Sequence, residues 1–241
     1  MKGNIWAFLL DFDGVIFPND LVAQHLIQTL NLTESVWSES YEAAKNGSHY
    51  VDYDKIIAHI AKSQRIEEDH MWRILDKMIR EPVFSQYAAQ DAIRCFKQMG
   101  HVEMVTQGAK RYQNAKLEAS EMITLLGKEN IRVINEDKKN LLEQRALKLI
   151  EQGHKHIFLI DDRPGILSIV QQSFPENIIA IRIQTGKYAS ELDPENSYLK
   201  SPDMRSWITV PSIIKARGVV EAIHSGSPEG VVASISGRMR R

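Results

Sequence analysis

The apolar positions along the chain fall into two kinds of pattern. Short, mainly apolar runs occupy residues 5–10, 102–105, 131–134, 157–160 and 178–183, and the first of them is continuously apolar. Runs of this length suit the strands of a parallel sheet that is buried on both faces. Helical spacing of apolar residues separates most of these runs, over residues 88–99, 110–126, 141–151 and 166–172. Residues 207–214 predict a last short strand that runs into a final helix.

The alternation of strands and helices sets the expected fold class. Strands that alternate with helices of about ten residues or more predict right-handed βαβ units and a parallel sheet. Gly100, Gly127 and Gly153 each follow a helical pattern, as glycines at helix ends commonly do. We therefore expect a Rossmann-like α/β core with helices on both faces of a parallel sheet, built from residues 1–17 and 85–224.

Residues 20–80 carry a different pattern, because no convincing strand interrupts their helical periodicity. Apolar residues recur at helical spacing in three stretches of this segment. Thr33 and Glu67 lie near plausible helix starts. We expect residues 18–84 to form a small all-helical domain inserted into the core. Residues 225–241 are rich in Ser and Gly, and we expect them to be a disordered tail.

Composition narrows the class of protein further. The chain has 241 residues, of which 30 are Lys or Arg and 31 are Asp or Glu, so its formal net charge is -1. This balance argues against bulk nucleic-acid binding. Cys95 is the single cysteine and fits a reducing compartment. No stretch approaches the roughly 18 apolar residues that span a bilayer. We expect a cytoplasmic protein without a membrane or nucleic-acid partner, and the sequence leaves its oligomeric state open.

Polar residues follow four of the predicted strands where each strand ends. In an open α/β sheet, ligands bind outside the carboxyl ends of the strands. In chain order, the residues delivered there are Asp11 and Asp13, then Thr106, then Lys138 beside Lys139, and finally Asp161 and Asp162.

The types of these residues indicate phosphoryl-transfer chemistry. Aspartates that converge at one edge repel one another unless a cation lies between them. Oxygen ligands alone select a hard ion, so Mg²⁺ is the expected metal. A lysine and a threonine nearby would donate to phosphate oxygens. A carboxylate nucleophile, a hard cation and such donors are the parts that phosphoryl transfer needs.

The four segments together resemble the ordered motifs of the haloacid dehalogenase-like hydrolase superfamily. The first is Leu-Leu-Asp-Phe-Asp-Gly-Val at residues 9–15, and the second is Val-Thr-Gln-Gly at 105–108. Lys138 resembles the third motif, and Ile-Asp-Asp at 160–162 resembles the paired-aspartate form of the fourth. Each motif alone is weak, but four in order at strand ends are a strong signal.

The resemblance implies a catalytic role for four residues. Asp11 would attack phosphorus and become an aspartyl phosphate. Asp13 would protonate the leaving oxygen and then activate the water that hydrolyses the intermediate. Thr106 would donate a hydrogen bond to a phosphoryl oxygen. Lys138 would neutralise charge between nucleophile and phosphate, with Lys139 as its rival for this role.

The resemblance also implies a magnesium site and a substrate class. Asp161 would bind Mg²⁺ with the Asp11 carboxylate and the backbone carbonyl of Asp13, and Asp162 would hold the ion directly or through water. The helical insertion at residues 18–84 would be a cap that closes over the site and selects the substrate. The expected reaction is Mg²⁺-dependent hydrolysis of the phosphate monoester of a small metabolite.

Two alternatives stay open at this point. A phosphomutase would use the same aspartyl phosphate and return the phosphoryl group to its substrate. A binding module with the same fold would not turn over at all, although such a module has no chemical need for both Asp11 and Asp13. In this superfamily the phosphatases and phosphomutases keep the second aspartate, whereas dehalogenases and phosphonatases do not. The resemblance therefore favours phosphate chemistry.

Overall fold

The computed structural model of the protein describes residues 5–45, 50–84, 87–185 and 207–226. These residues fall into two compact units. Unit 1 comprises the described residues within 1–16, 87–104 and 139–241, and unit 2 comprises those within 17–86 and 105–138. The predicted domain boundaries near residues 17 and 84 stay a prediction. The predicted disordered tail lies outside the described residues, apart from Ser225 and Gly226.

The strands form a six-stranded sheet in the order β3-β2-β1-β4-β5-β6. Pairing is parallel between β1 and β2, β1 and β4, β4 and β5, and β5 and β6. The strands are β1 Trp6–Leu10, β2 His101–Gln107, β3 Ile131–Ile134, β4 His156–Asp161, β5 Ile178–Ile183 and β6 Ile208–Val210. This sheet confirms the predicted α/β class and each predicted strand.

Strand β1 lies between β2 and β4, which explains its continuous apolar sequence. Ala7, Phe8, Leu9 and Leu10 all have an exposed fraction of 0%. The Phe8 ring stacks on Phe96 at a centroid distance of 4.7 Å and on Phe158 at 5.2 Å. A strand that is covered on both faces favours apolar side chains along its whole length.

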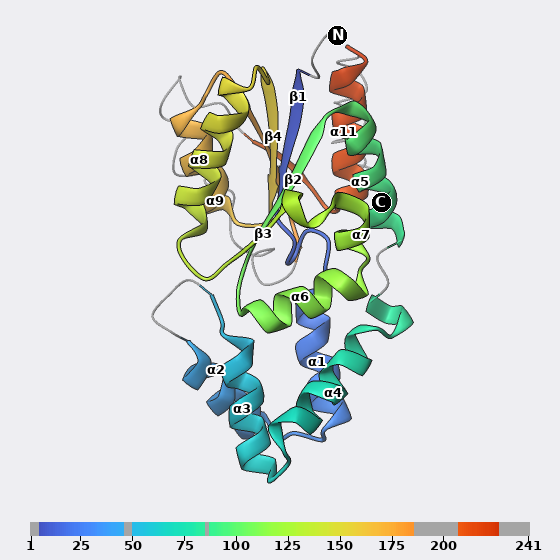
Figure 1. Cartoon of the computed structure of the whole chain (residues 1–241), viewed down its shortest axis with the longest axis vertical. Coiled ribbons are helices and arrows are strands. Elements are labelled where there is room, and N and C mark those ends of the chain that lie inside the picture. The colour runs from blue at the N-terminus through green and yellow to red at the C-terminus, as the bar shows by residue number, and fades with distance from the viewer. Residues whose placement is uncertain (1–4, 46–49, 85–86, 186–206, 227–241) are drawn as a thin grey trace, which may run out of the picture. The chain divides into compact units, whose positions relative to one another are not determined.

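Helices cover both faces of the sheet in unit 1, as predicted. Figure 1 shows α5 and α11 on one face, and α8 and α9 on the other. Their bounds are α5 Tyr87–Met99, α8 Lys138–Glu151, α9 Pro164–Ser173 and α11 Ile213–His224. Pro164 starts α9, where a missing backbone N–H costs no hydrogen bond. No helix among the described residues combines the length and apolarity that crossing a membrane requires.

Unit 2 contains the helices predicted for residues 18–84. They are α1 Asn19–Thr29, α2 Glu34–Ala44, α3 Tyr53–Gln64 and α4 Glu68–Ile79, followed by a 3-10 turn, η1 Pro82–Phe84. Side-chain caps fix two of the helix starts. Thr33 accepts a hydrogen bond from the Val36 amide at the start of α2, and Asp52 accepts from the Asp54 amide at the start of α3.

One predicted helix is divided into two in the structure. Residues 110–126 were expected to form a single helix, but α6 Lys110–Ala119 and α7 Met122–Leu126 are separate. The break lies at Glu121, whose φ of 60° is left-handed. Before it, the Ser120 hydroxyl donates to the Lys116 carbonyl at 2.8 Å. The chain continues through the 3-10 turn η2 Lys128–Asn130 into β3.

Helix α6 packs with the helices of residues 18–84 within unit 2. Tyr112 of α6 stacks on Tyr53 of α3, with ring centroids 4.1 Å apart. The neighbouring Arg111 lies over the ring of Trp72 on α4, 4.2 Å from its centroid, and 3.8 Å from Asp69. The helix that follows the second motif in sequence is thus a structural neighbour of the predicted cap.

Candidate metal centre and active site

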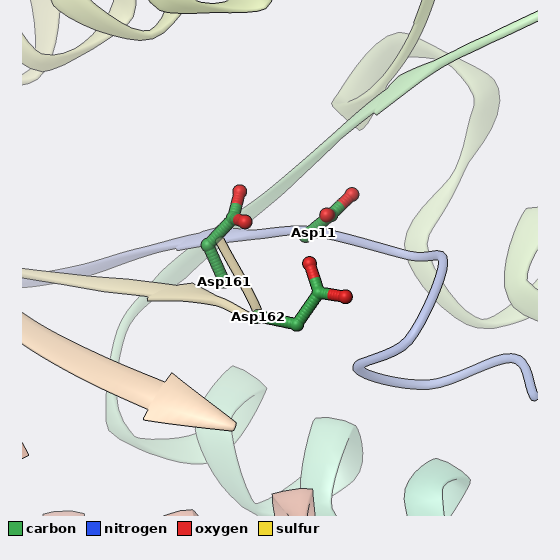
Figure 2. A group of neighbouring side chains, drawn as sticks. All are labelled: Asp11, Asp161 and Asp162. Carbon is green, nitrogen blue, oxygen red and sulfur yellow. The ribbon is translucent and has the colours of Figure 1, made fainter. Parts of the chain in front are cut away.

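Three buried aspartates converge at the carboxyl ends of β1 and β4. Asp11 directly follows β1, Asp161 is the last residue of β4, and Asp162 comes next (Figure 2). One carboxylate oxygen from each lies within 4.8 Å of the others. The exposed fractions are 5% for Asp11, 0% for Asp161 and 5% for Asp162.

The register of the sheet produces this convergence. Leu10 of β1 pairs with Ile160 of β4, and the Asp11 amide donates to the Ile160 carbonyl at 2.8 Å. The next residue along each strand is an aspartate. Because paired residues of parallel strands present their side chains to the same face, Asp11 and Asp161 are brought together by the backbone itself.

Backbone donors stabilise part of the negative charge of the cluster. Two carboxylates about 5 Å apart repel by about 3 kcal/mol at an effective dielectric constant of about 20. The Phe12 amide donates to Asp11 at 2.7 Å, and the Arg163 amide donates to Asp161 at 2.8 Å. Each such bond stabilises one carboxylate, and a cation bound between the three would lower their mutual repulsion.

The chemistry of the cluster suits a metal ion. All of its candidate ligands are carboxylate oxygens, which hard divalent ions prefer. Gly14 leaves room for Asp162, because a Cβ atom at position 14 would lie 2.3 Å from the Asp162 Oδ2 atom. Gly14 also has a φ of 76°, which glycine adopts without strain. The glycine of the first motif is therefore required both by the turn and by the carboxylate beside it.

Asp13 lies in the same turn, two residues after Asp11, and is half-buried. The turn is tied to the end of β5, because the Thr185 hydroxyl donates to the Gly14 carbonyl. The prediction from sequence missed Thr185. No motif signals such a contact, since it joins residues that are far apart in the chain and depends on where β5 ends.

Thr106 and Lys138 belong to unit 2, so their relation to the aspartates stays a prediction. Thr106 has an exposed fraction of 0%, and its Oγ1 atom has no hydrogen-bond partner among the described residues. Lys138 begins α8 and is 1% exposed, whereas Lys139 is half-buried. A buried hydroxyl without a protein partner leaves room for a water molecule, an ion or a ligand to complete its hydrogen bonding.

Hydrogen bonds join the loops that carry the second and third motifs. The Gln107 side chain donates to the Glu136 carbonyl at 2.6 Å. The Gly108 amide donates to the Ile134 carbonyl at 2.8 Å. Because Gln107 follows Thr106 and Glu136 precedes Lys138 by two residues, these bonds hold the two motif loops to each other within unit 2.

A buried lysine that the sequence prediction did not consider lies beside the start of α1. Lys116 of α6 is 0% exposed and donates to the Asn19 side chain at 3.3 Å. The Tyr112 hydroxyl donates to the same Asn19 oxygen at 2.8 Å. The Lys116 ammonium also lies 4.2 Å from the ring centroid of Tyr112 and 5.3 Å from that of Phe17. Tyr112 and Lys116 are four residues apart, so the sequence could have predicted that they lie side by side on one face of the helix.

The sequence matches no protein-family model and no curated protein. Solved structures match over nearly the whole chain. A protein from Burkholderia xenovorans LB400, provisionally assigned as a haloacid dehalogenase-like hydrolase, is 19% identical with a TM-score of 0.64, over 88% of this chain and 97% of that one.

Two other matches show the range of proteins with this architecture. YfnB of Bacillus subtilis, provisionally assigned as a HAD-hydrolase and solved bound to magnesium, is 13% identical with a TM-score of 0.53, over 92% of this chain and 98% of that one. The defluorinating L-2-haloacid dehalogenase Rha0230 is 11% identical with a TM-score of 0.53, over 90% of this chain and 95% of that one. This chain therefore has the fold of the haloacid dehalogenase-like hydrolases, the superfamily that its four motifs resemble.

Proposed function

We propose that the protein is a Mg²⁺-dependent phosphatase that hydrolyses the phosphate monoester of a small metabolite through an aspartyl phosphate on Asp11. The buried cluster of Asp11, Asp161 and Asp162 is the observation that carries this proposal. Three carboxylates held together in a buried position are costly for a fold alone, and they are what a hard cation and a phosphoryl group require. The single cysteine favours a cytoplasmic setting.

Asp11, Asp161 and Asp162 would hold the metal, together with the backbone carbonyl of Asp13. When bound, Mg²⁺ supplies positive charge that stabilises the ionised Asp11 and the phosphoryl oxygens of the substrate. The chain contributes the positions of the carboxylates, and the register of β1 and β4 brings Asp11 and Asp161 together. Gly14 contributes the space into which the Asp162 side chain extends.

Asp11 and Asp13 divide the chemistry between them. The Asp11 carboxylate attacks phosphorus while the bond from phosphorus to the leaving oxygen breaks, and Asp13 gives its proton to that oxygen. Asp13 then takes a proton from a water molecule, whose oxygen attacks the phosphorus of the aspartyl phosphate. The bond from phosphorus to Asp11 breaks, inorganic phosphate leaves, and both carboxyl groups return to their starting state.

Thr106 and Lys138 would bind the phosphoryl oxygens. The unpartnered hydroxyl of Thr106 supports this role, because a donor that no described protein group satisfies is ready to bind a ligand. The deep burial of Lys138 favours it over Lys139, since a buried ammonium interacts more strongly with a phosphate than a partly exposed one does. The predicted cap would then select the metabolite.

Asp13 supports phosphate chemistry over dehalogenation. A haloacid dehalogenase transfers a carbon group to its aspartate and expels halide, which needs no protonated leaving oxygen. A second carboxyl group two residues after the nucleophile serves the reaction when the leaving group is an alkoxide. A reaction that releases halide likewise does not require a cluster of carboxylates that could bind a metal.

The direct test is release of phosphate from an aryl phosphate, with and without Mg²⁺. We expect Mg²⁺-dependent activity in the wild type, and a loss of at least about 1,000-fold in Asp11→Asn. Asp91→Asn removes an exposed carboxylate on α5 and should keep full activity. Parallel assays with an L-2-haloacid measure halide. Halide release without phosphate release would make the protein a dehalogenase, and hydrolysis by Asp11→Asn at the wild-type rate would remove the nucleophile from the mechanism.

A further inference from the structure

One arginine contacts Asp161 and a second lies in register with it on the neighbouring strand, and the proposed mechanism uses neither. The Arg163 Nε atom lies 3.7 Å from the Asp161 Oδ1 atom, with side-chain exposures of 16% for Arg163 and 1% for Asp161. The Arg163 backbone amide donates to the same oxygen at 2.8 Å. The residue after the metal cluster therefore contacts Asp161 with both its backbone and its charge.

Arg182 of β5 is the second arginine. It pairs in register with Asp161 across the sheet, so the two side chains project from the same face. Its exposed fraction is 0%, and it is the largest fully buried side chain among the described residues. Arginine is rarely buried unless a charged or polar group compensates it.

The end of β5 also adjoins the turn of the first motif. Thr185, three residues after Arg182, donates to the Gly14 carbonyl. Asp11, Asp161 and Arg182 thus follow one another across neighbouring strands β1, β4 and β5 at the same edge of the sheet. A row of two anions and a buried cation is built into the sheet by its register.

A positive charge beside Asp161 should stabilise the metal-free protein and weaken the binding of a metal ion. A positive charge beside Asp161 offsets the repulsion among the three carboxylates when no divalent ion is present. The same charge repels an incoming cation and so weakens its binding. A residue that merely packs against the cluster would affect stability without raising the affinity for a metal when it is removed.

We propose that Arg163 and Arg182 are internal counter-ions of the aspartate cluster. They are positioning residues that hold Asp161 in its ligand position without metal, and they lower the affinity for Mg²⁺. The inference rests on the proposed function in one respect, because it takes Mg²⁺ as the ligand of the cluster. It predicts that bound Mg²⁺ replaces these arginines as the positive charge that compensates the aspartates. The two arginines would therefore set the affinity of the site for Mg²⁺.

The test measures two quantities on the full-length protein. Isothermal titration calorimetry measures the dissociation constant for MgCl₂, and thermal unfolding in EDTA measures the melting temperature of the metal-free protein. For Arg163→Gln we expect Mg²⁺ to bind about tenfold more tightly and the metal-free melting temperature to fall. Arg163→Lys keeps a charge near Asp161, so its dissociation constant for Mg²⁺ and its metal-free melting temperature should lie close to the wild-type values. Arg94→Gln removes an exposed arginine on α5 and should change neither.

Arg182→Met tests the buried arginine in the same way, because methionine fills similar space without charge. It should also tighten Mg²⁺ binding. If Arg182→Met does not fold, the part-exposed Arg163 still decides the question. Lower melting temperatures with unchanged or weaker Mg²⁺ binding would make both arginines structural and overturn the inference, while leaving the phosphatase proposal standing. A wild-type protein that binds no Mg²⁺ would overturn the proposed function, and the inference with it.

Discussion

At the scale of single residues, Gly14 is where the backbone and the carboxylate cluster constrain each other most closely. Its positive φ and the 2.3 Å separation of a built Cβ from the Asp162 oxygen both exclude a side chain. Gly14→Ala should displace Asp162 and weaken Mg²⁺ binding by at least about tenfold, which calorimetry can measure. Gly165→Ala is the matched control, since its Cβ would meet nothing within 4 Å. Equal affinities in the two variants would show that Asp162 is not a ligand.

Asp13 allows catalysis to be separated from metal binding. Asp13→Asn removes the acid and base but keeps the backbone carbonyl. We expect kcat to fall by about 100- to 10,000-fold for an alkyl phosphate, while the Mg²⁺ dissociation constant changes by no more than about threefold. Steady-state kinetics and calorimetry on the same preparation measure both. A variant that keeps the wild-type kcat would exclude proton transfer by this residue.

The sequence was most informative about residues at strand ends, and least informative about their neighbours in space. Asp11, Asp161 and Asp162 could be predicted to meet because parallel strands bring their carboxyl ends to one edge. Arg182 could not, because its position beside Asp161 depends on the register of β5, which no local pattern encodes. An arginine within an apolar strand was nevertheless a signal, since a charge at such a position needs a compensating group.

At the scale of elements, a buried ion pair joins β2 to α8 in unit 1. The Arg145 Nε atom donates to Glu103 at 2.6 Å, and the His101 Nε2 atom lies 2.9 Å from the same carboxylate. Burial alone would raise the pKa of Glu103, but the hydrogen bonds from His101 and Arg145 outweigh it and lower the pKa from 4.5 to about 2. A depressed folded-state pKa means that the carboxylate stabilises the fold when it is ionised.

The pH dependence of stability should follow from this pair. The contribution of Glu103 is fully present above the unfolded pKa of 4.5 and is lost as the pH falls toward about 2. At pH 7, Glu103→Gln should lower the free energy of unfolding by about 3 kcal/mol. Chemical denaturation of both proteins from pH 7 to 2.5 measures the difference, which should shrink below about pH 4.5. A constant difference across this range would mean that the charge of Glu103 contributes nothing.

Element boundaries were predictable where one pattern dominated. The strands matched to within about two residues, because their apolar runs are bounded by polar residues on both sides. The division between α6 and α7 was not predictable, since residues 110–126 keep their helical periodicity through the break. Glu121 adopts a left-handed conformation there without being glycine or asparagine, the residues that usually signal it.

At the scale of the whole molecule, the carboxylate cluster should make stability depend on metal. A ligand at 100 times its dissociation constant raises the free energy of unfolding by about 2.7 kcal/mol, or about 5–10 °C in melting temperature for a chain of this length. Asp162→Asn should abolish the shift with MgCl₂ and raise the melting temperature in EDTA, because one of three mutually repelling charges is gone. Thermal unfolding with and without Mg²⁺ measures both, and an unchanged shift in the variant would contradict the assignment of Asp162.

The most direct test of the central claim is chemical trapping of the phosphorylated aspartate. Borohydride reduces an aspartyl phosphate to homoserine, and mass spectrometry of the digested protein locates the change. The protein should carry homoserine at position 11 after treatment with an aryl phosphate and Mg²⁺, and should not when Mg²⁺ is omitted or in Asp11→Asn. Mg²⁺-dependent phosphate release without homoserine at position 11, or with it at another aspartate, would contradict Asp11 as the nucleophile.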